Sequence, residues 1–250
     1  MVRLLYHILS ELSIRTAQKI KIGSKKSREG KDMNLFKIAE NLQQALVDAG
    51  VRFTLDGYPI IPDEMILQDY PDEMVPFEHR NTCKDPHKTV LTHFSNDELL
   101  YRRLRHIDED IEICKSYMGV AGFDLSPRLG WNVEQQKFNL LINQMVNAYR
   151  AIHGVKILPN FRIGDITTIS ALDSFPSNGL YAVGALGCSK GYASINSAYL
   201  TTKLLYKRPD GLLVYGKLMP QYQSVLDDFG IPYRVYEDFK STCYRRKKVS

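Results

Sequence analysis

Residues 180–191 read LYAVGALGCSKG, and their order repeats through the second half of the chain. The apolar residues 180–183 predict a buried strand, and the glycines with Ser189 and Lys190 predict a tight turn before a helix. Free amide groups at a helix N-terminus suit an anion such as phosphate. The spacing matches neither GxxxxGK[ST] nor GxGxxG, so the turn is not an established nucleotide loop. A glycine-rich turn with a solvated lysine is the alternative interpretation.

Five apolar, β-prone runs follow one another from Gly119 onward, and a glycine closely precedes each of them. Helical patterns separate the runs, most clearly at 132–152, 195–206 and 221–229. This alternation predicts repeated β-α units that form a mostly parallel sheet covered by helices. We therefore predict an α/β core over residues 118–240, built either as a doubly wound sheet or as a partial or broken β/α barrel. The five runs are 120–125, 155–161, 180–186, 212–218 and 233–239.

Residues 33–117 predict a helical and loop-rich extension that packs on this core. An apolar stripe predicts a helix over 34–49, and a hairpin with an Asp56-Gly57 turn follows it. Five of the eleven prolines lie between residues 59 and 86, where they make regular structure hard to sustain. We expect this segment, 56–87, to be a long loop that covers a site or wraps the periphery. A capping box that starts at Ser95 predicts a second helix, which continues to about residue 117.

The positive charge of the chain is concentrated at its two ends. Residues 1–30 hold seven Lys and Arg against two acids, and residues 240–250 hold five and no acids, whereas the 209 residues between them hold 21 and 26. We assign 1–32 to a short amphipathic helix with a Gly/Ser/Lys-rich linker, and 241–250 to a basic tail. Such tails are either simply solvated or contact nucleic acid.

Composition narrows the class of protein. A chain of 250 residues can bury a sizeable core, and no apolar run approaches the roughly 20 residues that span a bilayer. The four scattered cysteines predict reduced thiols, so we expect a cytoplasmic protein without membrane association. A loose set of histidines with one cysteine is spaced more widely than structural zinc ligands, and we predict no metal site there. That set is His79, Cys83, His87 and His93.

Polar residues follow the predicted strands where their carboxyl ends would meet, which is where α/β folds bind ligands. Asp124 and Asp165 are the candidate catalytic residues, as a general base and acid or as ligands of a divalent cation. Asp165 as a helix cap and Asp124 as the start of a turn are the structural alternatives. The candidate ligand-binding residues are Ser126, Arg128, Asn160, Arg162, Gly187, Ser189, Lys190 and Lys217.

Four segments, in this order, resemble a domain family of unknown function that occurs in bacteria, bacteriophages and other mobile elements. They read GFDLS at 122–126, ILPNFRIGD at 157–165, VGALGC at 183–188 and VYG at 214–216. The family has an asparagine-rich helix after the first motif, and this chain carries asparagines at 132, 139, 143 and 147. It departs from the family in having Arg162-Ile163 where an aromatic residue often stands. The resemblance implies a phage or mobile-element origin and supports the choice of Asp124 and Asp165, but it supplies no reaction.

Two functional hypotheses follow from these residues. In the first, a cytoplasmic α/β protein of a phage or mobile element in a bacterial host binds a phosphate-bearing ligand, a nucleotide or nucleic acid, at the strand ends. In the second, the protein is a non-catalytic module that binds nucleic acid or a protein partner through its basic tails. The substrate, a catalytic activity and the oligomeric state are left open by the sequence.

Overall fold

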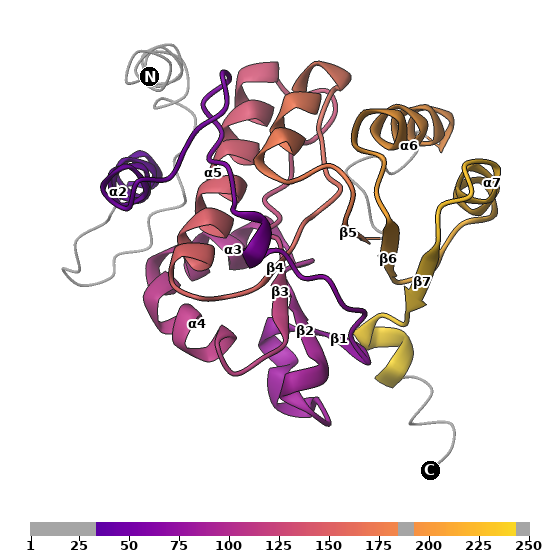
Figure 1. Cartoon of the computed structure of the whole chain (residues 1–250), viewed down its shortest axis with the longest axis horizontal. Helices are drawn as coiled ribbons and strands as arrows, with labels where there is room; N and C mark the ends of the chain where they lie inside the picture. Colours follow the sequence, from indigo (N-terminus) through magenta and orange to yellow (C-terminus); the bar gives the residue numbers. More distant parts are fainter. Residues whose placement is uncertain (1–33, 185–192, 244–250) are drawn as a thin grey trace.

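The computed structural model describes residues 34–184 and 193–243 (Figure 1). The predicted N-terminal helix and linker, the glycine turn at 185–191 and most of the basic tail lie outside these residues. All seven strands of the described chain are parallel to their neighbours, in a four-stranded sheet with the order β1-β2-β3-β4 and a three-stranded sheet with the order β5-β6-β7. The strands are β1 Glu73–Pro76, β2 Thr89–Thr92, β3 Gly119–Ala121, β4 Ile157–Leu158, β5 Leu180–Gly184, β6 Gly211–Tyr215 and β7 Tyr233–Tyr236.

The two sheets are joined edge to edge between β4 and β5. Asn160 forms an isolated parallel bridge with Ala182. The amide of Phe161 donates to the carbonyl of Ala182 at 2.8 Å, and the amide of Ala182 donates to that of Pro159 at 2.7 Å. The seven strands therefore follow one another in space in the order in which they occur in the chain.

This strand order distinguishes between the two architectures that the sequence allows. A doubly wound sheet reverses its strand order at a switch point, whereas a β/α barrel keeps the chain order throughout. The last strand also returns to the first: the hydroxyl of Tyr236 donates to the carbonyl of Pro71 at 2.9 Å, and the rings of Phe239 and His79 stack at 3.7 Å. No backbone pairing joins β1 to β7 within residues 34–184 and 193–243. The prediction of repeated β-α units is confirmed, and the arrangement is that of an incomplete barrel.

Buried side chains from every strand meet on the inner face of this sheet. Their alternation with outward residues along each strand is what the pleat of a β-strand produces. They form one cluster, and Phe94 and Met118 pack against it. The cluster consists of Leu67, Met74, Val90, Ala121, Leu158, Leu180, Ala182, Leu213, Tyr215 and Tyr236.

Helices cover the outer face of the sheet (Figure 1). The long helix α5 lies against the four-stranded sheet and packs against α2 and η5, while α6 and α7 pack together outside the three-stranded sheet. The α-helices are α2 Leu35–Asp48, α3 Asp97–Arg103, α4 Ile107–Cys114, α5 Val133–Ile152, α6 Ala193–Lys207 and α7 Pro220–Asp228. The 3-10 segments are η1 Asp63–Met65, η2 Phe77–Thr82, η3 Pro86–Lys88, η4 Leu104–His106 and η5 Ile166–Ser174.

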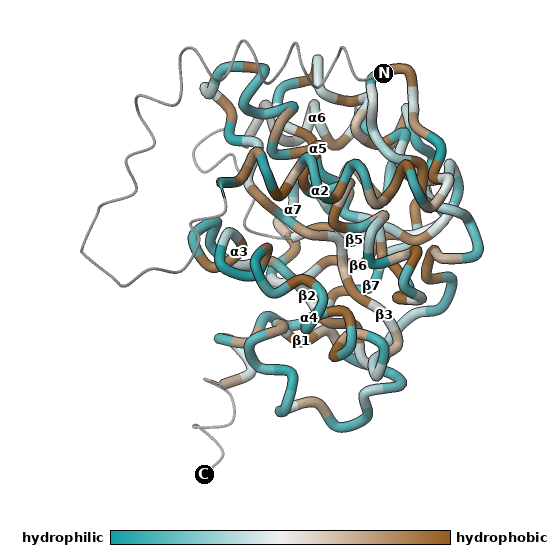
Figure 2. Tube along the Cα trace, turned by 90° about the vertical axis from the view of Figure 1, so that its left-hand side faces the viewer, coloured by the Kyte–Doolittle hydropathy of each residue, from teal (hydrophilic) through white to brown (hydrophobic). Residues whose placement is uncertain are grey.

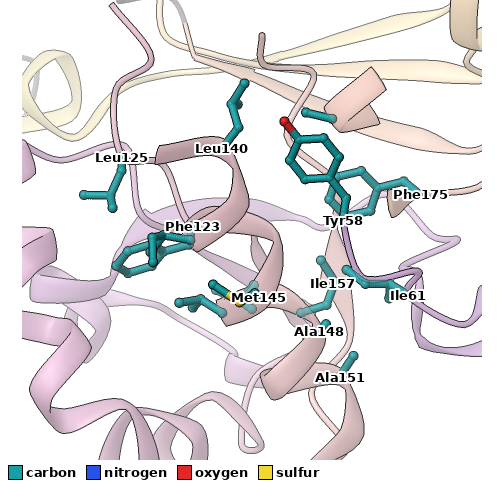
Figure 3. Close-up of a cluster of buried hydrophobic side chains, with 14 of the residues drawn as sticks. Tyr58, Ile61, Phe123, Leu125, Leu140, Met145, Ala148, Ala151, Ile157 and Phe175 are labelled. Atoms are coloured by element: carbon teal, nitrogen blue, oxygen red, sulfur yellow. The ribbon is translucent and has the colours of Figure 1, made fainter. Parts of the chain in front are cut away.

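The larger hydrophobic core lies between the sheet and α5 (Figure 3). Leu140, Met145, Ala148 and Ala151 project from α5 toward residues of the sheet and of the segment before β1. In the described residues, hydrophobic residues concentrate in the strands, whereas α2 alternates between hydrophobic and hydrophilic residues (Figure 2). An amphipathic helix of this kind buries its apolar stripe and leaves the other face to solvent.

The extension before residue 118 differs from the prediction in three respects. The proline-rich segment, expected to be a loop, contains β1, and β2 follows directly after it. The capping residue of α3 is Asn96, whose side chain accepts from the amide of Leu99, whereas the hydroxyl of Ser95 donates to Glu78. The predicted single helix from Ser95 is divided into α3, η4 and α4. The predicted helix over 34–49 and the hairpin are present, the latter as one antiparallel bridge between Phe53 and Pro59.

Candidate functional site

The candidate site is the rim formed by the residues that follow the carboxyl ends of the strands. Asp124 and Arg162 are the charged pair at its centre, after β3 and β4 respectively. Nε of Arg162 lies 3.2 Å from Oδ1 of Asp124, and their side chains are 15% and 6% exposed. Burial raises the pKa of Asp124 to about 6, the charge of Arg162 opposes this shift, and Asp97 adds to it. The ends of β3 and β4 therefore bring a partly exposed arginine next to a buried carboxyl group whose pKa is raised.

The backbone around Asp124 is held by a ladder of asparagines on one face of α5. Oδ1 of Asn147 accepts from the amide of Phe123 at 2.8 Å. Asn143 binds both backbone groups of Leu125, accepting from its amide at 2.8 Å and donating to its carbonyl at 3.0 Å. These positions are four residues apart, so their side chains project from the same face of the helix. Side-chain amides thus bind backbone groups that a neighbouring strand would otherwise bind. They fix the residues on both sides of Asp124.

Asn160 connects the ends of β3 and β4. Its Nδ2 donates to the carbonyl of Gly122 at 2.7 Å, and it is 6% exposed. Its Oδ1 is buried and has no hydrogen-bond partner in the described part of the chain. A buried acceptor without a partner costs about 1–3 kcal/mol, so this oxygen is a favourable place for a donor from outside the protein.

Asp97 links Ser126 and Arg128 to the rim. It was not among the candidates predicted from the sequence. Oδ1 of Asp97 accepts from the amide of Ser126 at 3.0 Å, and Oδ2 pairs with Nη2 of Arg128 at 3.5 Å. The exposed Arg128 also lies over the ring of Trp131. Asp97 is thus the second carboxylate beside Asp124.

The side chain of Asp165 caps the N-terminus of η5, which is the structural alternative predicted from the sequence. Its Oδ1 accepts from the amide and hydroxyl of Thr167 at the start of η5, and its Oδ2 accepts from Tyr199 at 3.3 Å. The hydrogen bonds from Thr167 lower the pKa of Asp165. Its carboxylate is therefore stabilised in the charged form and already has three donors, whereas Asp124 pairs with Arg162.

Lys217 is exposed just after β6, where Gly216 has a φ of +101°. The turn residues Gly187, Ser189 and Lys190 lie outside the described residues, and their part in the site stays a prediction. The ends of β3 and β4 bring together Asp124, Asn160 and Arg162. Asp97 connects Ser126 and Arg128 to this group. Asp165 points instead toward η5 and α6.

Three rim residues were missed because their strands or strand ends were not assigned correctly. Phe94 is partly buried and stacks on Tyr215 at 5.6 Å, and a side chain at Gly184 would press against its ring. Thr92 is fully buried, and its side chain is hydrogen-bonded to that of Tyr215. Glu78 accepts from Ser95 at 3.3 Å through Oε2, while its buried Oε1 has no partner in the described part of the chain. The β-branched run at Thr89–Thr92 was the available signal for β2.

Behind the rim, a buried histidine and arginine are in contact. Nη2 of Arg150 lies 3.0 Å from Nε2 of His93, and both side chains pack against the ring of Phe123. Burial and the charge of Arg150 lower the pKa of His93 well below its ordinary value, so the histidine is neutral and its Nε2 accepts. Arg150 is 1% exposed, so this pair supports the wall of the site from inside the core.

The described residues contain no group of three or more His, Cys, Asp and Glu side chains placed to hold a metal ion. The ion pair with Arg162 also gives Asp124 a protein cation as its partner. No helix within the described ranges is long and apolar enough to cross a membrane.

A family model described as "Domain of unknown function (DUF4417)" matches residues 53–232. The chain belongs to this family. The DUF4417 match includes β1 to β6, the asparagine ladder and the Asp124–Arg162 pair, and it ends just before β7. It confirms the resemblance to a domain family of unknown function that the motifs indicated. No curated protein and no solved structure matches the chain.

Proposed function

We propose that this DUF4417 protein binds a phosphate-bearing ligand, a nucleotide or nucleic acid, at the rim of its incomplete barrel. The observation that carries the proposal is the Asp124–Arg162 pair, a charged pair at adjoining strand ends whose arginine is still 15% exposed at its side chain. Moving two charges out of water is costly, and perturbed charged groups concentrate at functional sites. A guanidinium group binds phosphate through parallel hydrogen bonds, and the exposed Lys217 adds a second cation at the end of β6.

The same pair provides acid–base chemistry for a reaction on the bound ligand. A carboxyl whose pKa is about 6 exchanges its proton near neutral pH, which is what a general acid or base requires. The asparagine ladder holds the residues beside Asp124 in place. We therefore assign proton transfer to Asp124 and ligand binding to Arg162, with Asn160 at the end of β4 and Lys217 at the end of β6 as further ligand-binding residues.

The setting of this function is the cytoplasm of a bacterial host, in a phage or another mobile element. The motif resemblance supports that setting, as do the thiols of Cys83, Cys114 and Cys243, which are free in the structure. The competing hypothesis is a module that binds nucleic acid through its basic tails. The charge distribution favours it, because residues 1–30 and 240–250 carry the excess of Lys and Arg.

Calorimetric titration with nucleoside triphosphates tests the proposal. Arg162→Gln should weaken binding about tenfold or more, because hydrogen bonds to charged groups contribute about 1.5–3 kcal/mol. Lys217→Gln should weaken it severalfold. Lys88→Gln is the matched control: Lys88 pairs with Asp72 at the amino end of β2 and is 63% exposed, so its loss should leave the affinity unchanged.

Removal of residues 1–30 and 240–250 separates the two hypotheses. A rim site keeps its nucleotide affinity after this deletion. If the deletion abolishes all binding, if binding falls steeply with salt in the full chain, and if Arg162→Gln has no effect, the tails are the binding element and the rim proposal is wrong.

A further inference from the structure

The inner face of the rim presents the partly exposed aromatic ring of Phe94. Val90 in β2 belongs to the interior cluster, and Phe94, two residues after the end of β2, packs against the same cluster. The ring packs against the interior cluster but is itself only partly buried. Tyr215 stacks on it with ring centroids 5.6 Å apart.

Gly184 at the end of β5 leaves the space that this ring occupies. A Cβ atom at that position would lie 3.2 Å from Cδ1 of Phe94 and 3.5 Å from two further ring atoms. The ring therefore lies against both β5 and β6. A rigid, supported aromatic side chain at a rim is a surface on which a planar ligand can stack at little entropic cost.

Buried oxygen atoms without hydrogen-bond partners in the described part of the chain lie in η2, before β2, and at the end of β4. Ser95, the residue after Phe94, donates to Glu78. Oε1 of Glu78 and Oδ1 of Asn160 are buried and lack hydrogen-bond partners among the described residues. Asn160 is 6% exposed. These atoms are acceptors, so they suit a ligand with N–H or O–H donors at its edge.

We propose that Phe94 is the stacking platform for the base of a nucleotide, and that Glu78 and Asn160 accept hydrogen bonds from its nucleoside portion. This inference rests on the proposed function, since it takes the phosphate to be bound by Arg162. It narrows the ligand from a nucleotide or nucleic acid to a single nucleotide. The stacking surface is one ring supported from behind by Tyr215, which serves one base.

Comparison of two probes separates the base from the phosphate. AMP and ribose 5-phosphate carry the same phosphate and sugar, and only AMP has a base. Stacking of a base on an aromatic side chain contributes enough to give a roughly 5- to 100-fold preference for AMP in the full-length protein. Phe94→Leu, which keeps an apolar side chain of similar reach, should remove this preference and leave the affinity for ribose 5-phosphate unchanged.

Two further variants keep the test independent of folding. Phe94→Tyr retains the ring and should retain the preference for AMP, while Glu78→Gln should lower the affinity for AMP severalfold with the fold intact by circular dichroism. Equal affinity for AMP and ribose 5-phosphate in the wild-type protein, with no effect of Phe94→Leu, would overturn the stacking proposal while phosphate binding stands. Failure of both probes to bind would overturn the proposed function together with it.

Discussion

The two halves of the sheet interior differ in chemistry although the same strands build both. Through the middle of the sheet, inward positions are apolar and fully buried, as at Val90, Leu158 and Leu213. Two to four residues further along the strands, the positions hold Thr92, Asn160 and other polar groups, and Oδ1 of Asn160 is without a hydrogen-bond partner in the described chain. The apolar half contributes stability by removing surface from water.

This difference indicates which end of the molecule is built for function. A protein that needed only stability would continue the apolar lining to the end of each strand, because unpaired buried polar atoms are costly. In β/α barrels, residues at the carboxyl ends of strands carry the chemistry and the opposite end carries stability. The predictions below test this division, from the largest expected effect to the smallest.

Leu213→Ala should be the most damaging change in the apolar half. Leu213 is 0% exposed and central in β6, and removal of such a side chain costs about 2–5 kcal/mol of unfolding free energy. Urea denaturation measures this loss. Leu205→Ala is the matched control, because Leu205 on α6 is 61% exposed and its loss should cost below about 0.5 kcal/mol. Equal costs at the two positions would contradict the assignment of the core.

Asn143→Ala should have an effect of nearly similar size at the polar end. It leaves the buried amide and carbonyl of Leu125 without their partner, which we expect to cost about 2–4 kcal/mol. Asn81→Ala, at an exposed position in η2, is the control and should be close to neutral. If Asn143→Ala is also neutral in thermal and urea unfolding, the ladder does not hold residues 122–126.

Asp124→Asn should remove a pH dependence of stability. The pKa of Asp124 is about 6 in the fold against an ordinary value of 3.8, so in this window the folded state keeps a proton that the unfolded chain has lost. The free energy of unfolding therefore falls as pH rises through the window and stays reduced above it. We expect the wild-type protein to lose about 2–3 kcal/mol more than Asp124→Asn between about pH 4 and pH 7. Parallel pH profiles of the two proteins would show that Asp124 is not buried as described.

Asp97→Asn should have the smallest effect, a change in the pKa of Asp124. The negative charge of Asp97 raises that pKa, after burial and the opposing charge of Arg162. Removal of the charge should therefore lower the pKa of Asp124, as measured by NMR titration of its carboxyl carbon. Asp72→Asn, at the amino end of the sheet, should leave the pKa unchanged. A rise after Asp97→Asn would exclude Asp97 from the site.

The sequence predicted the second half of the fold well because its strands are apolar and its helices are amphipathic. The helical pattern over 132–152 became α5, Val133–Ile152, almost to the residue. β1 was missed because it has only four residues and lies in a segment rich in proline. Its inward side chain, Met74, packs against residues that are far along the chain. Pairing with β2 supplies the order that local propensity does not.

For the candidate site, the rule of strand ends found Asp124, Asn160 and Arg162, which the structure connects. It could not separate Asp124 from Asp165, because both follow predicted strands. Their difference arises from neighbours distant in sequence: Tyr199 and the turn at Thr167 engage Asp165, while Arg162 pairs with Asp124. Phe94 and Glu78 were not considered, since the strands that position them were not predicted.

The most direct test of the account is to map the binding of a nucleotide on the isotope-labelled protein by NMR. Titration with AMP should shift the amide signals of residues 93–95, 122–126 and 160–162, at the carboxyl ends of β2, β3 and β4. The amides of residues 88–90, at the amino end of β2, should stay in place. Shifts confined to residues 1–30 and 240–250, or shifts at the amino ends of the strands instead, would contradict the claim that the rim is the ligand site.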